Sequence, residues 1–260
     1  MSDKKKKRNL EEILKKIPVV ECGEKLVNLK NYSKNIIISL DPEIRKEEGI
    51  PEDVCYVRKG VAKRLLKAQR LLPKGYRLKI YEGYRTLLTQ RKLFVSHYKM
   101  LRKKYPELDN KKIKEMTEKF VASAFKYPPH ATGGAVDVTI VGPDNKELDM
   151  GTKVNETNKL SYTNSKRISK EARINRRLLV RVMRKAGFVN YYAEWWHWSY
   201  GDRYWAAICK KKRAIYGILN IDVKSIYEHK KVIKPKKYKR KRNKKLKRIK
   251  IMEENKKGIN

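Results

Sequence analysis

The spacing of apolar residues changes along the chain from a helical period to strand alternation. Within residues 57–72 the apolar positions recur three or four apart, which predicts an amphipathic helix. The segment 134–141, GAVDVTIV, instead alternates apolar with polar side chains, so that Asp137 faces away from the apolar side of a strand. Helices in the first part and strands later predict a single α+β domain with helices packed on a mostly antiparallel sheet.

The remaining elements follow from the same periodicities and from turn residues. Residues 76–82 alternate as a half-buried strand does, and a Gly-Tyr-Arg sequence ends that strand. Gly187 has the position of a residue that terminates a helix. We expect further helices at 87–104, 111–125 and 166–186, and aromatic strands at 188–200 and 203–208.

The chain is strongly basic. Its 260 residues include 67 Lys and Arg against 28 Asp and Glu, a net charge of +39. We expect a basic N-terminal segment at 1–16, a folded domain at 17–229 and a disordered basic tail at 230–260. The stretch Lys230–Lys250 contains no acid and is the candidate for nonspecific contact with a polyanion. A solubilising tail without a partner explains the same composition.

Targeting signals and disulfide patterns are not apparent in the sequence. No apolar run approaches the roughly 18 residues of a membrane span, and no apolar stretch follows the basic N-terminus as in a signal peptide. The three cysteines, Cys22, Cys55 and Cys209, are too widely spaced for a zinc knuckle or redox motif. We therefore expect reduced, mostly buried thiols and a cytoplasmic protein.

Two of the four histidines lie near carboxylates. His130 precedes Asp137 by seven residues in PPHATGGAVDV, and His197 follows Glu194 by three in EWWHW. Two histidines and one carboxylate form a catalytic zinc set that leaves the fourth position open for water. A further carboxylate that is not a ligand can take the proton of that water, and Glu194 fits this role.

The spacing alone leaves alternatives open. His130 could be an ordinary loop residue, and His197 could be a core residue of an aromatic strand. In an ideal strand Glu194 and His197 would also face opposite sides. They can share one site only if the strand bulges, ends or turns between them.

The chain resembles the zinc D-alanyl-D-alanine dipeptidases of vancomycin-resistance type, from about residue 19 to 219. The resemblance is carried, in order, by EGYR, HATGGAVDVTI, LDMGT, RRLLVRVMRKAGF, EWWHWSYGDRYWA and AIYG. It implies one Zn²⁺ per chain in a cleft, held by His130, Asp137 and His197. It also implies that Glu194 is the general base and that Arg85 stabilises the developing oxyanion.

Two positions depart from the resembled family and bear on the substrate. A serine two residues before the first zinc histidine and an aspartate after MGT hold the substrate ammonium in that family. Here these positions are Pro128 and Asn155, unless the neighbouring Glu156 takes the second role. We expect hydrolysis of the dipeptide D-Ala-D-Ala. The alternatives are a carboxypeptidase acting on longer peptides that end in D-Ala and, in another class, a nonenzymatic polyanion-binding protein.

Overall fold

The computed structural model describes residues 3–120, 127–156 and 158–232. The chain divides into two units, and the boundary lies between residues 224 and 225. The strands are β1 (Leu26–Asn28), β2 (Ile37–Ile38), β3 (Tyr56–Arg58), β4 (Arg77–Glu82), β5 (Ala135–Val141), β6 (Val189–Asn190) and β7 (His197–Ser199). The α-helices are α1 (Asp3–Lys16), α2 (Pro42–Glu48), α3 (Lys59–Arg70), α4 (Leu87–Lys104), α5 (Asn110–Phe120), α6 (Lys170–Lys185), α7 (Arg203–Ile208) and α8 (Val223–Val232). Two 3₁₀ helices, η1 (Leu29–Asn31) and η2 (Pro129–Thr132), complete the described elements.

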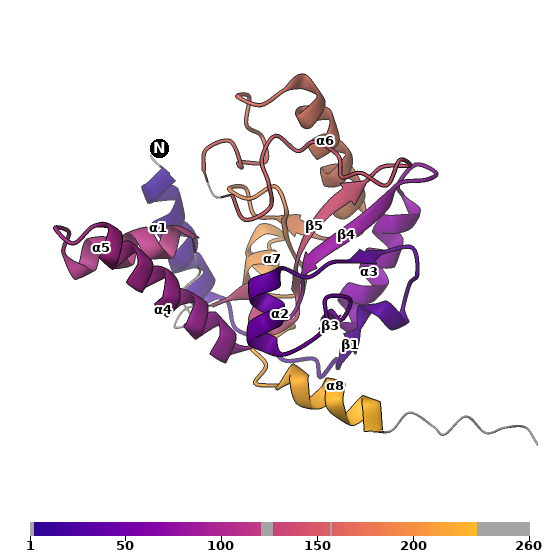
Figure 1. Ribbon diagram of the computed structural model, residues 1–260, viewed down its shortest axis with the longest axis horizontal. Coiled ribbons are helices and arrows are strands. Elements are labelled where there is room, and N and C mark those ends of the chain that lie inside the picture. The colour runs from indigo at the N-terminus through magenta and orange to yellow at the C-terminus, as the bar shows by residue number, and fades with distance from the viewer. Residues whose placement is uncertain (1–2, 121–126, 157, 233–260) are drawn as a thin grey trace, which may run out of the picture. The chain divides into compact units, whose positions relative to one another are not determined.

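The first unit is built on a five-stranded sheet with the strand order β2-β4-β5-β7-β6. Only the β2–β4 pair is parallel, whereas the other three pairs are antiparallel. Figure 1 shows α1, α4 and α5 on one side of β4 and β5, with α3 on the other side. This arrangement confirms the predicted α+β class with a mostly antiparallel sheet.

The centre of the sheet is fully buried. All seven residues of β5 are buried, and β4 alternates buried and half-buried side chains. The apolar faces of α3 and α6 bury Leu65 and Leu179, so the helical spacing in the sequence corresponds to packing in the core. Gly187 has a φ of 99°, as expected for a residue that ends a helix in the left-handed conformation.

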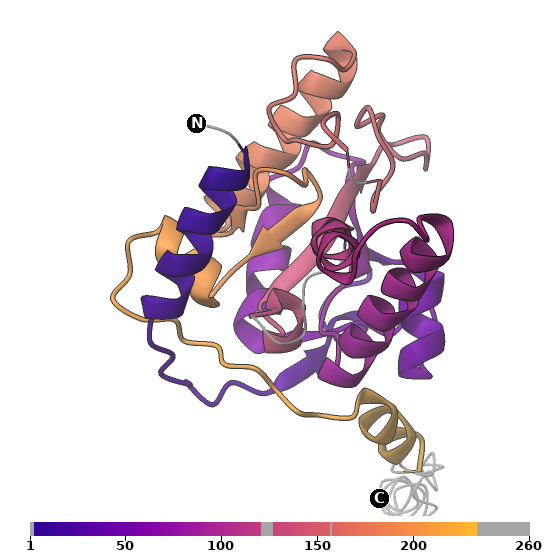
Figure 2. The same ribbon diagram turned by 90° about the vertical axis from the view of Figure 1, so that its left-hand side faces the viewer.

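The side of the sheet that carries α1 and α4 is the one that bears on function. Figure 2 views the molecule from this side and shows β5 in the space between α1 and α4. Side chains from both helices, including Leu14 and Met100, line a cavity of about 760 Å³ together with residues of β5 and η2. The sheet therefore forms the floor of a pocket that these helices flank.

The predicted strand at 203–208 is wrong. Residues 203–208 form helix α7 rather than a strand, because the Asp202 carboxylate accepts a hydrogen bond from the Trp205 backbone N–H at 2.7 Å and caps the helix. The expected burial of the cysteines is also wrong, since Cys22 and Cys209 are exposed and only Cys55 is buried.

Other predictions fall partly outside the described residues. The predicted helix 111–125 corresponds to α5 up to Phe120, and residues 121–126 lie outside the described part of the chain. Most of the basic tail, from residue 233 onward, is also outside it, so its disorder and its contact with a polyanion stay predictions. In the described part, no helix has the length and apolar character needed to cross a membrane.

Candidate metal centre

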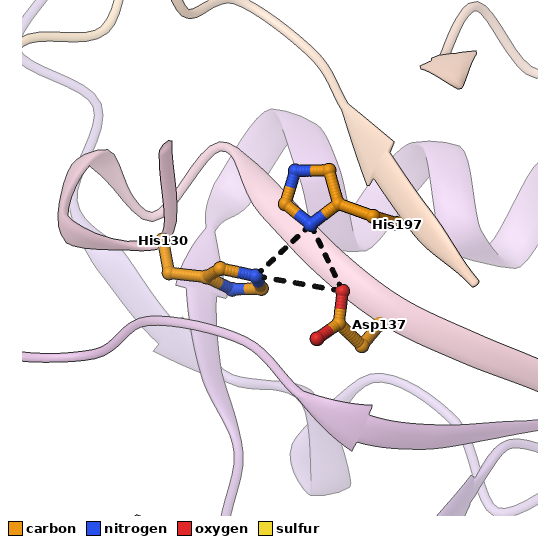
Figure 3. Close-up of side chains that lie close together, drawn as sticks. All are labelled: His130, Asp137 and His197. Carbon is orange, nitrogen blue, oxygen red and sulfur yellow. Dashed lines mark hydrogen bonds and ion pairs between the residues drawn. The ribbon is translucent and has the colours of Figure 1, made fainter. Parts of the chain in front are cut away.

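Three side chains from separate elements converge on one point of the cavity. His130 lies in η2, Asp137 on β5, and His197 is the first residue of β7. Asp137 and His197 are directly opposite each other in the β5–β7 pair, so their side chains share one face of the sheet. Figure 3 shows the two imidazoles and the carboxylate pointing toward one another.

The three nearest atoms form a small triangle. His130 Nε2 lies 3.2 Å from His197 Nδ1 and 3.4 Å from Asp137 Oδ1, and His197 Nδ1 lies 3.0 Å from Asp137 Oδ1. Ligand atoms about 2.0–2.2 Å from a tetrahedral zinc ion are about 3.3–3.6 Å from one another. The triangle is therefore close to one face of a zinc tetrahedron, and the donor set matches the sites that keep a fourth position open.

A backbone contact fixes the orientation of the His130 ring. The Nδ1–H of His130 donates a hydrogen bond to the carbonyl oxygen of Gly83 at 2.8 Å, which leaves Nε2 directed toward the cluster. Position 83 requires glycine because a Cβ there would lie 2.6 Å from the Tyr56 carbonyl oxygen. Glycine at this position therefore lets the turn after β4 pack closely against β3.

The cluster is buried and electrostatically suited to a cation. Burial lowers the pKa of His130, but the carboxylates of Glu82 and Asp137 outweigh burial and raise this pKa to about 9. Burial raises the pKa of Asp137, but the two histidines outweigh it and hold the pKa well below its usual range. The carboxylates that favour the protonated form of His130 also attract a metal cation, which has to displace that proton to bind the nitrogen.

Glu194 reaches the same cavity because the chain turns before β7 begins. The Glu194 N–H donates to the Tyr191 carbonyl oxygen at 3.0 Å, and the His197 N–H donates to the Glu194 carbonyl oxygen at 3.2 Å. Both Glu194 and His197 line the cavity. The predicted strand 188–200 is therefore interrupted, and this turn removes the conflict over which side each residue faces.

Asn190 stabilises this turn and was not singled out from the sequence. Its side-chain amide donates to the carbonyl oxygens of Glu194 and His197, each at 3.0 Å. A single asparagine in an aromatic segment gives no sequence signal for this role. The role follows only from the structure, where carbonyl groups in the turn lack strand partners and need another hydrogen-bond donor.

Arg85 lies at the same cavity and is held by two neighbours. Its Nε and Nη2 donate to the two carboxylate oxygens of Glu82, and its Nη1 donates to Gln90 Oε1 at 2.9 Å. Burial lowers the pKa of this guanidinium, but the Glu82, Asp137 and Asp41 carboxylates outweigh burial and raise it. Arg85 is therefore charged and oriented beside the cluster.

Glu82 is a second residue that sequence reasoning missed. Its side chain is 2% exposed, and it is paired with Asp137 in the β4–β5 ladder. A bulge between Ile80 and Glu82 shifts the register, so that Glu82 rather than Tyr81 is opposite Asp137. Strand alternation alone would have assigned Glu82 to the face of Leu78 and Ile80.

The structure also separates the two residues considered for the position after MGT. Asn155 lines the cavity, and its side-chain amide donates to Asp41 Oδ2 at 3.1 Å. Glu156 instead contacts its own loop, where it accepts hydrogen bonds from the Lys153 N–H at 3.2 Å and from Asn158 Nδ2 at 3.0 Å. The neutral side chain therefore occupies the cavity position.

The chain is similar to proteins of known family. A family model described as D-ala-D-ala dipeptidase matches residues 40–213. The D-alanyl-D-alanine dipeptidase of Synechocystis sp. (strain ATCC 27184 / PCC 6803 / Kazusa) is 27% identical over 220 residues, 73% of this chain and 87% of the relative. That of Enterococcus faecium is 30% identical over 155 residues, 55% of this chain and 71% of the relative. The solved LD-carboxypeptidase LdcB aligns with a TM-score of 0.42 and 20% identity, over 78% of this chain and 85% of that one.

Proposed function

Because this chain belongs to the D-Ala-D-Ala dipeptidase family of metallopeptidases, we propose that it hydrolyses the dipeptide D-Ala-D-Ala with one zinc ion held by His130, Asp137 and His197. The observation that carries the proposal is the triangle of three ligand atoms, 3.0–3.4 Å apart, in a cavity that Glu194 and Arg85 also line. A zinc ion bound there supplies Lewis-acid polarisation of the carbonyl oxygen and lowers the pKa of water to about 7.

Glu194 carries out the proton transfers in the proposed reaction. Its carboxylate is half-buried at the cavity wall and is not one of the three clustered ligands. In the proposed reaction it takes a proton from the attacking water and passes it to the nitrogen of the leaving D-alanine. The C–N bond breaks as that nitrogen is protonated, so the products are two D-alanine molecules.

Arg85 stabilises the negative charge that develops on the carbonyl oxygen in this reaction. A guanidinium has five N–H donors, and the bonds to Glu82 and Gln90 use three of them. The other two can donate to the oxygen as negative charge develops on it. Because Glu82 and Gln90 already fix the guanidinium plane, no reorientation is needed during the reaction.

The cavity volume favours a second candidate substrate. D-Ala-D-Ala has about 11 non-hydrogen atoms, whereas cavities of about 300–1,000 Å³ accommodate drug-sized ligands. At about 760 Å³, this cavity has room for a longer peptide ending in D-Ala. A carboxypeptidase activity on such peptides is therefore the alternative.

The test is D-alanine release by the zinc-loaded protein. Free D-Ala-D-Ala and an N-acylated peptide ending in D-Ala-D-Ala are assayed side by side, with Glu194→Gln as the blank. We expect release from the free dipeptide and none above background from the variant. Release from the blocked peptide alone would establish the carboxypeptidase, and no release from either substrate with zinc in place would refute both activities.

A further inference from the structure

Asp41 is held at the start of α2 by three hydrogen bonds. Its Oδ1 accepts from the backbone N–H groups of Glu43 at 2.9 Å and Ile44 at 3.3 Å, so it caps the helix. Its Oδ2 accepts from the Asn155 amide at 3.1 Å. A carboxylate has about four acceptor positions, so these bonds leave room for one further donor.

Asp41 and Asn155 line the cavity that contains the metal cluster. They reach it from distant parts of the sequence, because α2 and the loop after β5 meet at its wall. Asn155 has a φ of 66°, a left-handed conformation that asparagine and aspartate tolerate better than most residues. The backbone therefore presents the amide of residue 155 to Asp41 without requiring glycine.

The charge of the cavity differs from that of the chain. Lys and Arg outnumber Asp and Glu by 67 to 28 in the sequence, yet seven Asp or Glu and three Lys or Arg are among the cavity-lining residues that the structure describes. Three of the acidic residues are close to the cluster in sequence: Asp137 belongs to it, and Glu194 and Asp202 lie within five residues of His197. Asp41 caps α2 and Glu43 lies in its first turn, so acidic groups occur away from the cluster as well. An acid-lined cavity in a basic protein favours a substrate that carries a positive charge.

We propose that Asp41, oriented by Asn155, binds the free α-ammonium group of the dipeptide substrate and makes the enzyme selective for peptides with an unblocked amino terminus. This inference rests on the proposed function and names a residue that recognises the substrate at the same site. The neutral Asn155 cannot offset an ammonium charge, but it donates a hydrogen bond to a carboxylate that can. The charge is thus supplied by α2 rather than by the loop after β5.

The decisive variant is Asp41→Asn. Asparagine caps helices about as well as aspartate, so α2 is retained while the negative charge is removed. A hydrogen bond to a charged group is worth about 1.5–3 kcal/mol, which corresponds to a fall of about 10- to 150-fold in kcat/KM for free D-Ala-D-Ala. For N-acetyl-D-Ala-D-Ala, which lacks the ammonium, we expect a change of less than about threefold.

Two further variants distinguish a direct contact between Asp41 and the ammonium group from a general attraction by the negative charges of the cavity. Glu43→Gln removes an exposed acid of the same helix from the same cavity, and we expect a change of less than about threefold for either substrate. The double variant Asp41→Asn with Asn155→Asp exchanges the amide and the carboxylate. It should recover most of the discrimination in favour of the free dipeptide.

The outcomes distinguish this inference from the proposed function. Equal loss on the free and acetylated dipeptides, no loss with Asp41→Asn, or an equal effect of Glu43→Gln would overturn the role of Asp41 while leaving the peptidase intact. If neither substrate is cleaved, the proposed function fails, and calorimetric binding of both dipeptides to the zinc-loaded protein decides the role of Asp41. Tighter binding of the free dipeptide that Asp41→Asn abolishes would support it, and equal binding would overturn it.

Discussion

The backbone N–H of His197 donates a hydrogen bond to the carbonyl oxygen of Glu194 at 3.2 Å, across a turn that ends where β7 begins. This bond places two residues three apart in sequence on the wall of one cavity, although a continuous strand would direct them to opposite faces. The proposed ligand and the proposed base therefore depend on the same turn, and their functions can be separated by substitution.

Replacing Glu194 and His197 should have different effects on metal content. Glu194→Gln should retain zinc and lose about 10²- to 10⁴-fold in kcat, because only the proton acceptor is removed. His197→Ala should lose zinc, because one of three ligand atoms is removed from the cluster. Metal analysis and D-alanine release on the same preparations test both. Wild-type turnover by Glu194→Gln would exclude it as the base.

Asn190→Ala should weaken the turn that carries both residues. The substitution removes the amide that donates to the Glu194 and His197 carbonyl oxygens. We expect the free energy of unfolding to fall by about 1–3 kcal/mol and zinc affinity to fall with it. Asn175→Ala is the matched control. The Asn175 amide donates to the Asp149 carbonyl oxygen at 2.8 Å, and neither residue belongs to the cluster. If both variants change zinc affinity equally, Asn190 has no specific role at the site.

The sequence predicted the elements whose side chains repeat regularly against the core. The strands at 77–82 and 135–141 and the helices at 59–70 and 170–185 are of this kind, because an apolar stripe or alternation determines both the element and its buried face. The short aromatic segment 203–208 has no such repeat, and the side chain of Asp202 decides in favour of a helix. Short apolar runs are ambiguous for this reason.

The candidate site was predictable only in part. Residue types and spacing singled out His130, Asp137, Glu194 and His197 as candidates, and the resemblance added Arg85. The pairing of β5 with β7, which places His197 opposite Asp137, joins segments about 60 residues apart and leaves no local pattern. Glu82 was missed because its pairing with Asp137 depends on a bulge that strand alternation does not indicate.

Glu82→Gln should impair catalysis through Arg85. The buried Glu82 carboxylate binds two nitrogens of the guanidinium, so a neutral amide would hold Arg85 less firmly. We expect Arg85→Ala to lower mainly kcat, as for a contact made in the transition state, and Glu82→Gln to lower kcat in the same way. If Glu82 acts as a positioning residue, the double variant should lose little more than Arg85→Ala alone. Additive losses at unchanged zinc content would show that Glu82 acts independently of Arg85.

The three thiols should differ in reactivity. Cys22 and Cys209 are exposed, whereas Cys55 is fully buried next to Gly83. Burial, and to a lesser extent the Glu82 carboxylate, raises the pKa of the Cys55 thiol well above its usual range. Because the thiolate is the reactive form, Cys55 should remain unreactive as the pH rises from 7 to 9.

A thiol-specific reagent whose absorbance changes on reaction counts the reactive thiols directly. We expect two labelled thiols per folded chain across this pH range and a third only after unfolding in denaturant. The Cys22→Ser, Cys209→Ser double variant should show none until it unfolds. Rapid labelling of that double variant in its folded form would contradict the burial of Cys55. Because Cys55 packs against the turn that holds the His130 ring, such a result would also mean that this side of the metal centre opens readily to solvent.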